Sequence, residues 1–394
     1  MKTEFDILII GAGLVGLTTA LACAKSGAQV AILDRSEIAM GRDARASALS
    51  STSLRLFTNL GVNIIDDLQP IHDMLVTEGA PDSPWCLHFD GAGEEGHLGG
   101  IIENPLLKSA LIEKVKASNA IQSFTPIHVH DFVESGKGVT IETDQGILKS
   151  RLLIAADGRD STVRQKTGIT LQRFDYAASS LVTMISHALP HDGLAWQRII
   201  KGGALAVLPL TGTRSQIVWS GPTQAVEAAQ ALPESDFLAL LSEKMNGYLG
   251  EMQLTAPRQS YPLRLQVADS FSKGRIALVG DAAHIIHPLA GQGLNLGLRD
   301  AAALADGVKS AHQTGQDLGV ASLLDYALWR NTDTRALGAL THLISESSGA
   351  KGPIGHARRL GLAMVNRSSE LKSIFETRAA GENQDLPELM RKPS

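Results

Sequence analysis

Three stretches of this 394-residue chain combine glycines with carboxylate residues in patterns that could bind phosphates and sugars. The first pattern has Gly11, Gly13 and Gly16, and Asp34 follows after a second apolar run. Glycines at such a turn let a pyrophosphate approach a helix N-terminus, where free N–H groups and the helix dipole favour an anion. Asp34 can accept hydrogen bonds from ribose hydroxyls. We therefore expect dinucleotide binding here rather than a turn that only packs closely, although this pattern does not distinguish FAD from NAD.

The second stretch runs from Leu153 to Arg164 and contains Asp157-Gly158. It predicts a buried strand, a sharp turn at these two residues, and a helix capped near Asp160 or Ser161. An ordinary strand, turn and helix with solvated charges is the alternative for this segment.

The third stretch, from Arg275 to Gly297, begins with an apolar strand that ends at Gly280-Asp281. The Asp281 carboxylate could bind a second set of sugar hydroxyls. A glycine-rich loop then leads into a helix whose first N–H groups lie around residues 293–295. Because reduced flavin carries negative charge near its pyrimidine end, a helix N-terminus there would stabilise it.

The elements around these motifs indicate an α/β protein. Buried parallel strands are expected at 5–10, 29–33, 152–155 and 275–279, and antiparallel strands within 179–220. Helices are expected at 14–26, 44–60, 104–119, 223–247, 293–310 and much of 321–380. This order predicts a Rossmann-like FAD-binding domain built from separated segments, with an inserted, mostly antiparallel β substrate domain and a helical C-terminus. The predicted FAD-binding segments are 1–75, 104–169 and 266–380, the substrate-domain segments are 76–103 and 170–265, and 381–394 is a loose polar tail.

Composition excludes several classes of protein. With 36 basic and 41 acidic residues, nothing favours a nucleic-acid partner. Two cysteines, Cys23 and Cys86, are too few for a disulfide scaffold or a cysteine-rich zinc site, so we expect no metal and a reducing, cytoplasmic location. The uncharged run 7–24 is interrupted by glycines and preceded by acidic residues. We therefore expect a soluble protein, at most peripheral to the inner face of a membrane.

Taken together, the three motifs resemble those of the FAD-dependent aromatic hydroxylases of the para-hydroxybenzoate hydroxylase type. The stretch His287–Asp300 closely resembles the signature of the ubiquinone-biosynthesis hydroxylases, and 45–50 and 204–210 support it. The resemblance implies bound FAD, NAD(P)H as a transient electron donor, and a flavin hydroperoxide that hydroxylates a polyprenylated phenol. Other ubiquinone-biosynthesis proteins are possible partners. No second GxGxxG is present, which fits a nicotinamide that binds transiently.

The resemblance also implies roles for particular residues. The three glycines of the first motif would hold the FAD pyrophosphate, and Asp34, followed by Arg35, the adenosine ribose. Arg45 would lie near the flavin or its phosphates, and Asp157 and Gly158 where FAD and the nicotinamide donor approach. Relatives often have a basic or polar side chain near position 104 that reaches the pyrophosphate, for which the candidate here is Asn104. Asp281, after Gly280, would contact the ribityl chain, and the isoalloxazine would be lined by Pro288, Gly291, Gln292, Gly293, Leu294 and Asn295.

Several interpretations stay open from the sequence. His284 and His287 could handle protons or only position their loop, and no catalytic base is visible. Cys23 fits a core position, while nothing decides for Cys86. Segment 351–380 has six basic and two acidic residues interleaved with apolar ones, which fits either a membrane-docking surface or a packed helix. Rival functions are a flavin-dependent reductase, a hydroxylase of a different small aromatic, and a non-catalytic flavoprotein scaffold. A halogenase is disfavoured because no WxWxIP motif is present.

Overall fold

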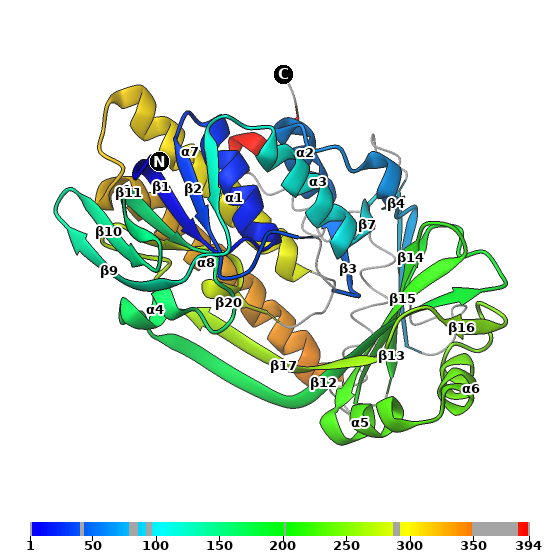
Figure 1. Ribbon diagram of the computed structural model, residues 1–394. Coiled ribbons are helices and arrows are strands. Elements are labelled where there is room, and N and C mark those ends of the chain that lie inside the picture. Colours follow the sequence, from blue (N-terminus) through cyan, green and yellow to red (C-terminus); the bar gives the residue numbers. More distant parts are fainter. Residues whose placement is uncertain are drawn as a thin grey trace.

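The computed structural model describes residues 2–39, 43–78, 86–91, 97–200, 202–286, 292–348 and 385–392. These residues form two lobes, one around a parallel sheet and one around an antiparallel sheet (Figure 1). The lobes confirm the α/β class, with a Rossmann-like domain built from separated segments and an inserted β domain.

The first lobe is built on parallel strands. Their apolar runs are buried on both faces, because helices cover a parallel sheet on both sides. Its strand order is β19-β11-β1-β2-β8, with β18 antiparallel at one edge and β10 and β9 extending from β11. The helices α1, α3, α4 and α7 belong to this lobe (Figure 1). The strand bounds are β1 Glu4–Ile10, β2 Val30–Leu33, β8 Ile121–Phe124, β9 Val129–Ser135, β10 Gly138–Thr143, β11 Gly146–Ala155, β18 Ser272–Lys273 and β19 Ile276–Leu278. The helix bounds are α1 Leu14–Lys25, α3 Asn104–Lys116, α4 Thr162–Lys166 and α7 Gln292–Thr314.

The second lobe is a sheet with the order β20-β17-β12-β15-β14-β13-β5-β6, in which β16 also pairs with β12. Alternate side chains of its strands, among them Trp196 and Trp219, form a core together with Phe237 and Leu241 of α6. The strand bounds are β5 Asp73–Glu78, β6 Cys86–Asp90, β12 Leu171–His187, β13 Leu194–Ile200, β14 Gly203–Leu210, β15 Arg214–Pro222, β16 Met252–Leu254, β17 Gln259–Ala268 and β20 His284–Ile285. The helix bounds are α5 Thr223–Ala231 and α6 Glu234–Lys244.

Two long strands join the lobes. β12 and β17 pair along both lobes, and their register shifts between Asp175 and Ser179. Ala177, inside this irregularity, has a positive φ of 51°, which a non-glycine residue rarely adopts. Figure 1 shows both strands running from beneath the parallel sheet into the antiparallel one. The two lobes are therefore joined by a pair of hydrogen-bonded strands.

The range 44–60 differs from the single helix that the sequence predicted. Residues Ala46–Ser50 form strand β3, which pairs with β7 (Gly99–Glu103), and β7 also pairs with β4 (Gln69–Pro70). Helix α2 then covers only Ser51–Leu60, and Ser50 caps it by accepting a hydrogen bond from the Ser53 N–H. Pairing with a strand distant in the sequence therefore overrides the local helical pattern. It also places β7 beside β3, although the sequence assigned it to a substrate-domain segment.

The C-terminal residues correct another expectation. The tail was predicted to be loose, but residues 385–392 pack against α2 and α7 through the short 3-10 helix η4 (Glu388–Met390). Met390 is buried, and the Asn59 side chain donates to the carbonyl oxygens of Leu389 and Arg391. A mostly polar segment is thus held to the protein by a buried apolar side chain.

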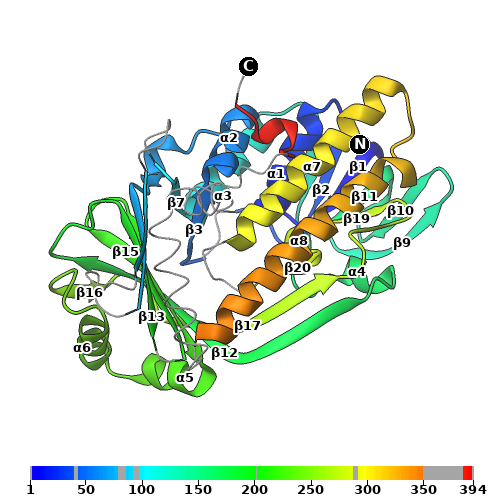
Figure 2. The same cartoon turned by 180° about the vertical axis from the view of Figure 1, so that it is seen from behind.

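Helix α8, Val320–Ser348, packs beside α7 on the back of the molecule (Figure 2). Segment 351–380, for which membrane docking was considered, lies outside the described residues. None of the helices in the described ranges is long and apolar enough to cross a bilayer.

Candidate FAD site

The three sequence motifs meet at the carboxyl edge of the parallel sheet. The Ala156 N–H donates to the carbonyl oxygen of Ile10 at 2.8 Å, and the Val279 N–H donates to that of Ala155 at 3.0 Å. The Gly11 N–H donates to the Leu33 carbonyl oxygen at 2.8 Å, which brings in the end of β2. This edge is where open α/β sheets bind their ligands, because the loops there converge.

The glycines of the motifs are of two kinds. A Cβ atom at Gly11 would lie 2.2 Å from the Ala156 carbonyl oxygen, and one at Gly16 would lie 2.0 Å from that of Gly11. These two glycines are required by backbone packing. By contrast, a Cβ atom at Gly13, Gly158 or Gly293 would meet nothing within 4 Å. Each motif therefore has one glycine with an open side, as the close approach of a bound cofactor requires.

Asp34 lies where the sequence placed it, at the end of β2. One of its carboxylate oxygens accepts from the Ala12 N–H at 2.7 Å, and the other accepts from the Ser36 N–H at 2.9 Å. The carboxylate is thus held against the glycine turn, and the next residue, Arg35, is exposed. This position suits a ribose adjacent to a pyrophosphate.

The Asp157 carboxylate has one engaged and one free oxygen. Its Oδ2 caps α4 by accepting from the Thr162 N–H at 2.8 Å. Its Oδ1 is buried and has no hydrogen-bond partner among the described residues. A buried acceptor without a donor is costly in a finished structure, so this atom fits a group that a bound cofactor would supply.

Arg164 connects the second motif to the third. Its side chain is buried, and it donates to the carbonyl oxygens of Ala282 at 2.8 Å and Arg159 at 3.0 Å. Burial lowers the pKa of the guanidinium, while the charges of Asp157 and Asp160 oppose that shift. This role is not visible in the sequence, because an arginine in a charged turn is usually solvated.

Arg45 and Asn104 form one hydrogen-bonded group with Asp43. Arg45 makes a two-pronged ion pair with Asp43, at 2.7 and 2.8 Å. The Asn104 side chain donates to Asp43 at 2.8 Å and accepts from the Ser47 hydroxyl at 2.7 Å. The hydrogen bonds with Arg45 and Asn104 lower the pKa of Asp43 although burial opposes them. In this structure the Asn104 amide is held by Asp43 and Ser47, and the contact with the pyrophosphate that the resemblance implies stays a prediction. The sequence signal for the ion pair was the spacing of two residues between Asp43 and Arg45.

The Arg45 guanidinium also reaches the second lobe. It lies 5.2 Å from the ring centroid of Tyr261 on β17, and the exposed Asp281 contributes to its electrostatic environment. Arg45 therefore stands between the third motif and the antiparallel sheet, and its place beside the flavin or its phosphates stays a prediction.

The third motif is described on both sides of its loop. Residues 287–291, which include His287, Pro288 and Gly291, lie outside the described residues. Helix α7 begins at Gln292, and Leu294 packs against the core. The buried Asn295 amide accepts from the Ser50 N–H at 3.0 Å and the Ser53 hydroxyl at 2.8 Å. It also donates to the Ala48 carbonyl oxygen at 2.9 Å. Asn295 thus joins α7 to the β3–α2 junction.

Replacing Asn295 with alanine is expected to lower the free energy of unfolding by about 2–3 kcal/mol, because three buried groups lose their partner. Chemical denaturation of the apoprotein measures this loss. Gln292→Ala, at the first turn of the same helix, is the comparison. Equal stability of the two variants would show that the Asn295 contacts contribute little.

His284 and Cys23 are both buried. His284 Nε2 hydrogen-bonds to Asp300 at 2.6 Å, which fits the positioning interpretation of this histidine. Cys23 is fully buried, and burial raises the pKa of its thiol to about 12, so it is unreactive in the core. Among the residues placed by the structure, no group of three or more His, Cys, Asp or Glu could hold a metal.

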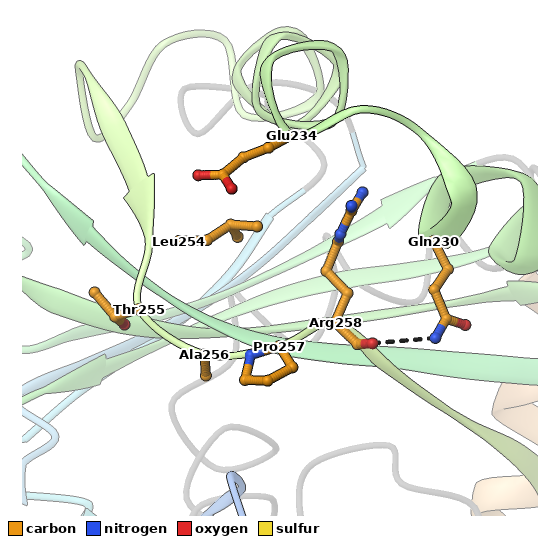
Figure 3. Close-up of a pocket in the computed structure, with 7 residues that line it drawn as sticks. All are labelled: Gln230, Glu234, Leu254, Thr255, Ala256, Pro257 and Arg258. Carbon is orange, nitrogen blue, oxygen red and sulfur yellow. Dashed lines mark hydrogen bonds between the residues drawn. The ribbon is translucent and has the colours of Figure 1, made fainter.

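A pocket of about 540 Å³ lies elsewhere, on the flank of the antiparallel lobe (Figure 3). Glu234 at the start of α6 and Arg258 before β17 line it, and the Gln230 side chain donates to the Arg258 carbonyl oxygen at 3.0 Å. It shares no residue with the three motifs and is wide open. It therefore does not compete with the sheet edge as the candidate cofactor site.

Comparisons with known proteins agree with this geometry. A family described as FAD binding domain matches residues 4–326. Ubiquinone hydroxylase UbiL of Rhodospirillum rubrum is 36% identical, over 98% of this chain and 92% of that protein. The 3-demethoxyubiquinol 3-hydroxylase of Escherichia coli is 30% identical, over 93% of this chain and 96% of that protein. The crystal structure of p-nitrophenol 4-monooxygenase PnpA from Pseudomonas putida has the same fold, with a TM-score of 0.82 and 19% identity over 98% of this chain and all of that one.

Proposed function

The chain belongs to the FAD-dependent aromatic hydroxylases, within the family of ubiquinone-biosynthesis monooxygenases, and from this we propose that it hydroxylates the ring of a polyprenylated phenol. NAD(P)H is the transient electron donor in this proposal, and dioxygen is the oxygen source. The observation that supports it best is the meeting of three motifs at one sheet edge, each with an open glycine. That arrangement suits a cofactor as long as FAD.

The residues at the edge suit successive parts of FAD. The N-terminus of α1 beside Gly13 would hold the pyrophosphate, and Asp34 the adenosine ribose. Asp157, with its free Oδ1, would accept from a cofactor hydroxyl, and Asp281 would contact the ribityl chain. Bound FAD supplies the redox chemistry that reduces dioxygen and transfers one oxygen atom to an electron-rich ring. The N-terminus of α7, at Gly293, would stabilise negative charge on the ring system.

The protein's own contribution is to hold the aromatic substrate between the lobes and exclude water. Two contacts fix the lobes around that space. The buried Gln216 of β15 hydrogen-bonds to both backbone groups of Ala46, and Arg214 forms a 2.8 Å ion pair with Glu103. Since Ala46 follows Arg45 directly, the antiparallel sheet is aligned with the residue expected beside the flavin. A rigid arrangement of this kind orients the ring and limits the access of water.

Incubation of the FAD-loaded protein with NAD(P)H, labelled dioxygen and a panel of prenylphenols tests the proposal. We expect one phenol to stimulate NAD(P)H oxidation and to gain a single labelled oxygen atom, detected by mass spectrometry. Hydrogen peroxide as the only product with every phenol would overturn the hydroxylase proposal and favour a reductase. Bound FAD without turnover would favour a scaffold.

A further inference from the structure

A buried charged cluster lies directly behind the Gly280-Asp281 turn. Asp300 of α7 and Arg330 of α8 are fully buried, and His284 of β20 is nearly so. Asp300 Oδ1 accepts from Arg330 Nε at 2.8 Å, and Oδ2 bonds to His284 Nε2 at 2.6 Å. Oδ2 also accepts from the Gly280 N–H at 3.0 Å. One carboxylate therefore holds the turn, the following strand and two helices together.

The carboxylate is held in its ionised form. Burial alone would raise the pKa of Asp300, but the charges of His284 and Arg330 and their hydrogen bonds keep it below its usual value. Hydrogen bonds to an ionised acceptor are about twice as strong as neutral ones. The Gly280 N–H is therefore fixed more firmly than an ordinary turn would fix it.

A second carboxylate in the cluster, that of Asp333, has different hydrogen-bond partners. Asp333 accepts from Arg330 Nη1 at 2.5 Å and from Arg299 Nη1 at 3.2 Å. The two carboxylates thus share Arg330, but Asp300 alone is hydrogen-bonded to the turn. Removing Asp333 therefore changes the charge of the cluster without breaking the bond to the turn, whereas removing Asp300 changes both.

Two buried polar atoms of the cluster have no hydrogen-bond partner among the described residues. These atoms are His284 Nδ1 and Arg330 Nη2. Buried polar atoms are usually satisfied, and unsatisfied ones reduce stability. Within the described residues, the best-defined bond of the cluster outside its own ion pairs is the one from the Gly280 N–H to Asp300.

We propose that Asp300 is a positioning residue for FAD, which fixes the Gly280-Asp281 turn relative to the N-terminal part of α7. Asp281 directly follows the backbone N–H that Asp300 holds, and Asp300 itself lies on the helix whose N-terminus is expected to face the flavin. The ribityl contact and the ring contact are thereby set by one side chain. This inference rests on the proposed FAD site.

Asp300→Ala and Asp333→Ala form the matched pair that tests it. Each removes one carboxylate that accepts from Arg330 and leaves Arg330 with the other. The Asp300 side chain is fully buried and that of Asp333 is 23% exposed, so we expect the larger loss in the unfolding midpoint of the apoprotein for Asp300→Ala. Asp300→Ala alone frees Gly280. We expect its FAD dissociation constant to rise about tenfold or more, with Asp333→Ala close to the wild-type value. At saturating FAD, the visible circular dichroism of the bound flavin should change only in Asp300→Ala.

The outcomes distinguish the inference from its premise. Failure of the wild-type protein to bind FAD would overturn the proposed site itself. Tight binding by the wild type, with equal affinities and flavin spectra in both variants, would overturn the positioning role and leave a structural cluster. If Asp300→Ala does not fold, Asp300→Asn is measured against Asp333→Asn with the same expectations, because the amide cannot accept from all three donors.

Discussion

Replacing Gly13 with valine is expected to abolish FAD binding while the apoprotein keeps its fold. Gly13 has an ordinary extended backbone, with φ −77° and ψ 179°, and a Cβ atom there would meet nothing within 4 Å beyond the neighbouring residues of the chain. Because Gly13 is the N-cap of α1 and already lacks a side-chain cap, the variant should cost about 1 kcal/mol or less of stability. The added methyl groups would occupy the space into which a pyrophosphate must come. FAD titration and thermal unfolding of the apoprotein measure the two effects separately.

Gly16→Ala is the comparison for this prediction. Its new Cβ would overlap the Gly11 carbonyl oxygen, so it should destabilise the apoprotein by about 1–3 kcal/mol or more. A Gly13 variant that binds FAD normally would contradict the assignment of the pyrophosphate site. One that unfolds as readily as the Gly16 variant would show that Gly13 is needed for packing instead.

Replacing Arg164 with methionine is expected to lower the free energy of unfolding by about 3 kcal/mol, and FAD affinity should fall with it. Methionine fills much of the same volume but cannot donate to the Ala282 and Arg159 carbonyl oxygens. The second and third motifs would then lose their side-chain connection. Chemical denaturation of the apoprotein and FAD titration measure the two losses.

Lys166→Met is the control on the same short helix. Lys166 and its ion-pair partner Asp131 are both exposed, and a surface interaction of this kind contributes little to stability. If both variants unfold at the same denaturant concentration as the wild type, the buried guanidinium is not a structural link between the motifs.

The sequence predicted most of the cofactor-binding lobe because its signals are local. The apolar runs that became β1, β2, β11 and β19 are short, continuous and bounded by turns, so their burial could be read directly. The glycine pattern before α1 was equally clear. It could not separate Gly13, which faces open space, from Gly11 and Gly16, which touch backbone, since that distinction depends on where β11 ends.

What the sequence missed depends on distant partners. Residues 46–50 have no strong strand pattern and become β3 only because β7 lies beside them. Arg164 belongs to a charged stretch, and only the fold encloses it between two turns. Likewise, Met390 lies in a mostly polar tail, and its burial requires the packing of η4 against α2 and α7. In each case a tertiary contact, and not the local composition, decides the structure.

The strand order also has a consequence for the chain as it leaves the ribosome. Strand β11 receives its neighbour β19 only after strands β12 to β17 of the antiparallel lobe have been translated, since Leu153 pairs with Ile276. Until then one apolar edge of the nascent sheet, Leu152 to Ala155, has no partner on that side, which is the kind of edge that promotes aggregation. The entropic cost of closing so long a loop grows only slowly with its length. We therefore expect the yield of soluble protein to be limited by exposure of this edge during synthesis, more than by the stability of the finished fold.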